Sequence, residues 1–262
     1  MESKNPVFSR APYGHQQQGW SGPPPSPDQL RDMYNSPSYA PPAERTMTID
    51  DVVVRSFMTL GTLVVSAAAA WVLQVPLGVA VVSAIIGVVL GLIASFKQST
   101  SPPLILGYAL FYGVFVGALS YMYESFFHGI VLQAVLGTAF AFAGVLTVYS
   151  LRIIRVTPKL VKFVLAAAIA AVGLVLVNLL VSIWVPGGLG LRSDNLLGWG
   201  FSALMILLGC FFLLLDFASV EEGVKQGAPA KFAWQCAFGL TLSLVWIYLE
   251  VLRFISYFSG DD

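Results

Sequence analysis

Two acidic residues lie in stretches of the sequence that are otherwise strongly apolar. Asp216 directly follows the apolar run 204–215, and Glu250 lies inside a second apolar run, 240–257. An ionisable side chain at membrane depth is costly, so it pairs with another polar group, takes up a proton or lines a water-filled path. These two carboxyl groups are therefore where we expect ion or proton chemistry.

The composition is that of a membrane protein. Hydrophobic residues make up 57% of the 262 residues and charged residues 11%, whereas soluble domains carry about 25% charged residues. The apolar residues come in blocks of the length, about 20 residues, that a helix needs to cross a bilayer. The net charge of zero argues against a nucleic-acid partner. We expect an all-α fold, a polytopic membrane helical bundle in contact with lipid.

Seven apolar blocks are long enough to be transmembrane helices. Breakers such as Ser101–Pro102–Pro103 separate them, and the two residues Val75 and Pro76 predict a tight hairpin between the first pair. The transmembrane domain covers 48–258 and is followed by a short C-terminal tail, 259–262. The predicted spans are 55–74, 77–96, 103–123, 128–151, 160–185, 196–220 and 232–258.

The segment 1–47 is rich in Pro, Gln and Ser and has little apolar area to offset the entropy of ordering, so we predict a disordered tail. It is either a tether or a Pro-rich ligand for a partner protein. The first helix follows it, with Thr48 as the N-cap and Asp50 and Asp51 at the positive end of the helix dipole.

Basic residues predict the orientation. They gather before the first span and in every second loop after it, whereas the alternate loops hold few. The pattern predicts a multi-pass protein of the cytoplasmic membrane with its N-terminus in the cytoplasm and its C-terminus outside. The residues on the cytoplasmic side are Arg45, Arg55, Lys97, Arg152, Arg155, Lys159, Lys162, Lys225 and Lys231, and Arg192 is the exception in the outer loops.

Two pairs of glycines have the GxxxG spacing that permits close helix contact. They are Gly87 with Gly91, and Gly113 with Gly117. Such pairs serve contacts inside the bundle or a face between two copies of the chain, and the sequence leaves both open.

No catalytic motif is present, so we expect no enzymatic activity, cofactor or resident metal. The sequence has no HExxH, GxSxG or P-loop pattern, and Cys210 and Cys236 have no metal-site spacing. His15 and His128 are isolated. A retinal protein would need a lysine deep in the last helix, and none follows Lys231.

Each acid has two interpretations. If the sixth span ends at Leu215, Asp216 is a boundary residue. If the helix continues to Val224, Asp216 lies about two turns inside it. Glu250 either forms a pair with Arg253 at i+3, near the outer interface, or belongs to a pathway.

The sequence resembles the Bax-inhibitor family, the seven-helix proteins with a transmembrane Bax-inhibitor motif, and more narrowly its bacterial branch found in actinobacteria. Three stretches carry the resemblance: 48–53 (TIDDVV), Leu215–Asp216–Phe217, and 240–253 (LTLSLVWIYLEVLR). In the last of these the wider family has a pattern like L-Y-L-D, followed ten residues later by Arg.

The resemblance implies a bundle with one central helix. It also implies two aspartates, on the sixth and seventh helices, that share a proton and gate a calcium leak. Asp216 matches the first aspartate. Aligning Arg253 with the arginine of the family puts Ser243 at the second position, and Glu250 is two turns further on the same face. Because Ca²⁺ prefers six to eight oxygens, Asp216 could hold it only transiently.

Two functions from different classes follow. The first is pH-sensitive passage or regulation of cations, with Asp216 as the titrating group, Ser243 as its hydrogen-bond neighbour, and Glu250 with Arg253 as an outer pair. The second is a non-conducting regulator that binds another membrane protein, such as a membrane protease, through the Pro-rich tail and the basic loop 152–162. The sequence does not determine the oligomeric state.

Overall fold

The computed structural model describes residues 26–28, 31 and 45–259. Most of the tail that we predict to be disordered, 1–47, lies outside the described residues, as does 260–262 at the other end of the chain. The chain divides into two compact units, Met1–Ala43 and Glu44–Asp262. The second unit contains the helical bundle.

The described part of the second unit contains seven helices that are long and apolar enough to cross a membrane, which confirms the predicted all-α membrane bundle. Four of the predicted connections are short turns, including the hairpin at Val75 and Pro76. The helices are α2 (Ile49–Val72), α3 (Leu77–Phe96), α4 (Pro102–Phe126), α5 (Ile130–Ser150), α6 (Pro158–Val181), α7 (Leu196–Lys225) and α8 (Ala233–Ser256), with a 3-10 turn, η1 (Ala230–Phe232), before the last.

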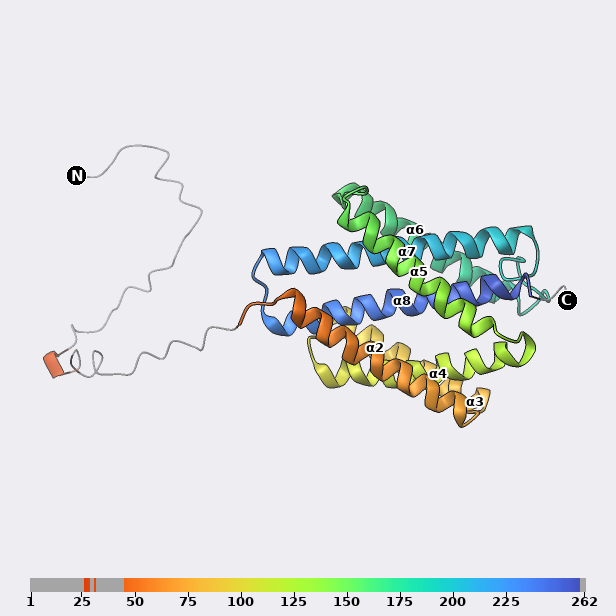
Figure 1. Ribbon diagram of the computed structural model, residues 1–262, viewed down its shortest axis with the longest axis horizontal. Helices are drawn as coiled ribbons and strands as arrows, with labels where there is room; N and C mark the ends of the chain where they lie inside the picture. The colour runs from red at the N-terminus through yellow and green to blue at the C-terminus, as the bar shows by residue number, and fades with distance from the viewer. Residues whose placement is uncertain (1–25, 29–30, 32–44, 260–262) are drawn as a thin grey trace. The chain divides into compact units, whose positions relative to one another are not determined.

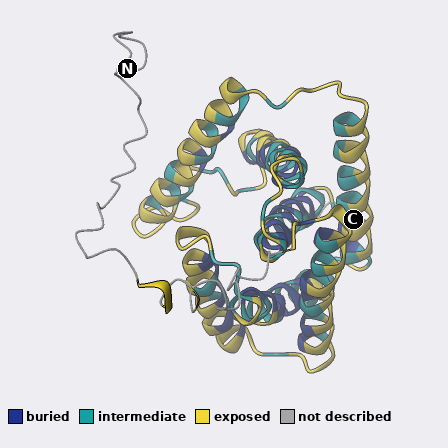
Figure 2. Cartoon of the chain, turned by 90° about the vertical axis from the view of Figure 1, so that its left-hand side faces the viewer, coloured by how far each residue is buried: buried dark blue, intermediate teal, exposed yellow. Residues whose placement is uncertain are grey.

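Helix α8 is the central element of the bundle. It packs against α2, α4, α5 and α7, whereas α3 packs mainly on α4 and α6 mainly on α7, and it runs between α7 and α2 in Figure 1. The exposed residues lie on the outward faces of the surrounding helices (Figure 2). Those faces are apolar and suit lipid. Functional polar side chains are therefore expected on α8 and on the faces of the surrounding helices that pack against it.

Backbone hydrogen bonds join the residues before α2 to the loop between α7 and α8. The N–H of Met47 donates to the carbonyl of Ala228 at 2.8 Å, and the N–H of Ala230 donates to the carbonyl of Arg45 at 2.8 Å. Met47 is buried beside Gly223. Arg45–Met47 fall within the range 1–47 that we predict to be disordered, and we call them the N-terminal strap.

Thr48 caps α2 as predicted. Its hydroxyl accepts the N–H of Asp51, and the carboxylate of Asp51 accepts the N–H of Thr48 at 3.0 Å, which completes a capping box. Asp51 also pairs with Arg45 at 3.2 Å. This ion pair connects the first turn of α2 to the N-terminal strap.

Replacing Thr48 with alanine is expected to lower the free energy of unfolding by about 1 kcal/mol, because an N–H at the start of α2 loses its acceptor. Thermal unfolding in detergent measures the change. Thr62→Ala is the matched control, since Thr62 is half-buried in the same helix and, among the described residues, its hydroxyl bonds the carbonyl of Met58 within that helix. An equal effect of the two substitutions would contradict the capping role.

Both glycine pairs serve contacts within the bundle. A Cβ built on Gly113 would lie 2.5 Å from the carbonyl oxygen of Leu63 in α2, and one on Gly87 would lie 3.1 Å from the backbone N of Tyr112 in α4. The pairs on α4 and α3 therefore let α4 approach α2 and α3 approach α4. This arrangement accounts for both pairs without a second copy of the chain.

Candidate functional site

Asp216 lies inside a helix rather than at its end. Helix α7 begins after Asn195, whose side chain accepts the N–H of Gly198, and continues to Lys225. Asp216 is nine residues before that end, or about 13 Å along the helix. The alternative in which the helix stops at Leu215 therefore does not hold.

Three residues of α8 surround the carboxyl group of Asp216. The hydroxyl of Ser243 donates to Oδ2 of Asp216 at 2.5 Å. A Cβ built on Gly239 would lie 2.8 Å from Oδ1, so the carboxyl group rests against bare backbone there. Cys236 interacts electrostatically with Asp216. Positions 236, 239 and 243 share one face of α8, which explains how they converge on one side chain.

Among the described residues, no positive charge compensates the carboxyl group of Asp216. Within the described residues, the hydrogen-bond partner of Asp216 is Ser243, and no basic side chain lies within ion-pair distance. Glu221, further along α7, bonds the hydroxyl of Tyr149 and pairs with Lys225 at 2.5 Å. Asp216 is half-buried and Ser243 is buried. A carboxyl group in such surroundings either ionises against one hydroxyl or takes up a proton.

Glu250 belongs to a separate cluster at the opposite end of α8. Its Oε1 accepts from Nη1 of Arg253 at 3.1 Å, and Nη2 of Arg192, from the loop between α6 and α7, lies 4.0 Å away. Burial and the neighbouring Arg253 lower the pKa of Arg192, and Glu250 opposes that shift. Within the described residues, Oε2 of Glu250 and the hydroxyl of Tyr257 are buried without a hydrogen-bond partner.

The structure does not bring Glu250 to Asp216. Glu250 is seven residues beyond Ser243, or about 10 Å further along α8. Ser243 is the residue that faces Asp216, and Arg253 stays with Glu250. Sequence reasoning did not give Arg192 a role at this site, although its isolation as the basic residue in an outer loop was a signal.

No group of three His, Cys, Asp or Glu side chains in the described part of the chain is placed to hold a metal ion. A groove of about 1000 Å³ is lined by residues of α2, α4, α5, α7 and α8, but its lining does not include Asp216. Its walls are almost entirely apolar, with Phe57, Trp71 and Phe142 among them. The polar contact between α7 and α8, rather than this groove, is thus the candidate site.

Comparison with known proteins identifies the family of the chain. A family model described as Bax inhibitor 1 like matches residues 5–260. No curated protein matches the chain. The match covers the seven helices, including the positions of Asp216 and Ser243. The chain therefore belongs to the Bax inhibitor 1 like family.

Proposed function

We propose that the protein is a pH-dependent cation leak, with calcium among the permeant ions and without enzymatic activity. The observation that carries the proposal is Asp216, a carboxyl group held between two membrane helices with one hydroxyl, that of Ser243, as its hydrogen-bond partner. A group so placed can change its charge when it binds a proton, and a change of charge at a helix interface alters packing.

The expected direction follows from the strength of that bond. A hydroxyl bonds an ionised carboxylate about twice as strongly as a neutral group. Ionised Asp216 therefore holds α7 against α8 through Ser243, and protonation loosens the contact. Cys236 is a further titratable group beside Asp216, and the more distant Glu221 is bound to Tyr149 and Lys225. We infer that flux rises as the pH falls.

The permeant ion passes in a largely hydrated state. Calcium takes six to eight oxygen ligands, and Asp216 with Ser243 offers only a few. The basic residues at the start of α2 and in the loops after α3, α5 and α7 support placing that end of the bundle in the cytoplasm of a bacterial cell. The cluster of Glu250, Arg192 and Arg253 then faces the outside.

Calcium flux into sealed proteoliposomes tests the proposal. The full chain is reconstituted with a calcium-sensitive dye inside the vesicles, and flux is followed in mildly acidic and mildly alkaline buffer. We expect flux that exceeds that of protein-free vesicles and is at least several-fold faster in the acidic buffer. Flux equal to that of empty vesicles, or unaffected by pH, would contradict the proposal.

The N-terminal strap supports a second candidate function, in which the protein regulates another membrane protein. Because Arg45 and Met47 bond the loop that joins α7 to α8, a partner bound to the preceding segment would act on the two helices that hold Asp216. Deletion of residues 1–43 leaves the strap intact. A regulator should then lose its partner in a pull-down, whereas a leak should keep its flux.

A further inference from the structure

Helix α8 carries a stripe of polar residues that repeats every seven positions. Cys236, Ser243 and Glu250 lie on one face, because seven residues make nearly two full turns, and Tyr257, the residue directly after α8, continues the spacing. All four are buried, with exposed fractions of 7%, 7%, 7% and 8%. Buried polar groups are costly in a membrane and mark ion or proton paths. The stripe joins the Asp216 site to the Glu250 cluster.

An apolar segment interrupts the stripe between Ser243 and Glu250. Ile247 lies one turn from each of them and is completely buried. A Cβ built on Gly209 of α7 would lie 2.8 Å from Cγ1 of Ile247, so the isoleucine rests on the bare backbone of that glycine. Leu213 is one turn further along α7 and is also completely buried.

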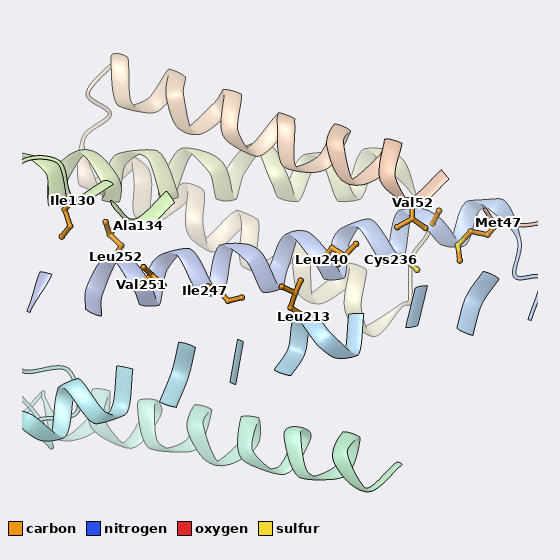
Figure 3. Close-up of a cluster of buried hydrophobic side chains, with 11 residues drawn as sticks. Met47, Val52, Ile130, Ala134, Leu213, Cys236, Leu240, Ile247, Val251 and Leu252 are labelled. Atoms are coloured by element: carbon orange, nitrogen blue, oxygen red, sulfur yellow. The ribbon is translucent and has the colours of Figure 1, made fainter. Parts of the chain in front are cut away.

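Figure 3 shows Leu213 on α7 reaching toward α8, between Ile247 and Leu240. All three belong to one cluster of buried apolar side chains. The indole Nε1 of Trp246 donates to the carbonyl of Met205 at 3.1 Å and holds the two helices together at this level. The contact between Ile247 and Gly209 is therefore tight, and the buried side chain of Ile247 lies between the two polar groups of the stripe.

We propose that Ile247, seated on Gly209 and flanked by Leu213, is the hydrophobic gate of the cation path. The inference rests on the proposed function and names the closed point of that path. A dry apolar constriction stops ions because their water cannot enter it. Loosening of α7 from α8 at the neighbouring Asp216–Ser243 contact lets water in. Oε2 of Glu250, which has no hydrogen-bond partner among the described residues, lies one turn beyond.

Ile247→Thr and Ile247→Val form a matched pair that tests the gate. The two replacements have nearly the same size and shape, but only threonine brings a hydroxyl that holds water. Each variant is compared after it elutes as a single peak in detergent. In mildly alkaline buffer, where wild-type flux is low, we expect Ile247→Thr to raise flux at least about tenfold over Ile247→Val. If both variants conduct calcium at the same rate, the gate is overturned and the proposed function is unaffected.

Chemical labelling tests the same gate without ion flux. Cys210→Ala leaves Cys236 as the single free thiol, and Cys236 lies beyond Ile247 from the outer end of α8. A membrane-impermeant thiol reagent is added outside right-side-out vesicles that carry either variant. The gate predicts that Cys236 reacts at least about tenfold faster in the Thr variant. Equal rates would overturn the gate alone, whereas absence of flux from wild-type protein would overturn the proposed function and the gate with it.

Discussion

Gly117→Ala is expected to destabilise the bundle by roughly 3 kcal/mol or more, because the new methyl group has no room. A Cβ at this position would lie 2.1 Å from the carbonyl oxygen of Ala67 and 2.7 Å from its Cα. These are backbone atoms of α2, so no side chain can rotate away and α2 must separate from α4. Thermal unfolding in detergent should show a lower midpoint, together with a loss of folded protein during purification.

Gly144→Ala is the matched control for this prediction. Gly144 lies in α5, and a Cβ there meets nothing within 4 Å. Alanine favours a helix over glycine by about 1 kcal/mol, so this variant should be as stable as the wild type or more stable. A Gly117→Ala protein as stable as Gly144→Ala would show that α2 and α4 do not approach each other as described.

Asp216→Asn is expected to remove the pH dependence of flux. Asparagine has the shape of a protonated aspartate and cannot ionise, so α7 and α8 should stay in the loosened state at every pH. Flux in mildly alkaline buffer should rise to the acidic wild-type level. Proteoliposome flux across a pH series measures the effect, which we expect to be at least about tenfold because protonation of Asp216 is the proposed switch.

Two further variants separate the switch from general damage. Ser243→Ala removes the hydroxyl that bonds Asp216, so flux in alkaline buffer should increase and the pH dependence should become weaker. Glu250→Gln alters the other cluster, whose partners are Arg253 and Arg192, and should leave the pH response intact. An Asp216→Asn protein that keeps the wild-type pH profile would contradict the role of this carboxyl group.

The bundle could be predicted because the sequence features that determine each helix lie within that helix or directly beside it. Blocks of apolar residues located all seven spans, and the prolines and glycines between them located the turns. The predicted sixth span ends at 220, whereas α7 continues to Lys225. The acids near that end lower the hydropathy, but Glu221 and Lys225 pair at i,i+4 and continue the helix for another turn.

The candidate site could be predicted only in part. Ser243 was identified as the partner of Asp216 because a fixed helical register relates it to Arg253 in the family pattern. Arg192 and the strap at Arg45–Met47 were not identified as contacts, since their partners are distant in the sequence. Gly209 was missed because a single glycine in a helix carries no spacing signal, unlike the two GxxxG pairs.

Infrared spectroscopy of the reconstituted protein tests the proton switch most directly. The difference between wild-type and Asp216→Asn spectra isolates the carboxyl group of Asp216, whose protonated form has its own C=O band. The account predicts that this band appears over the same pH range in which calcium flux rises. A carboxyl group that keeps one protonation state while the flux changes would contradict it.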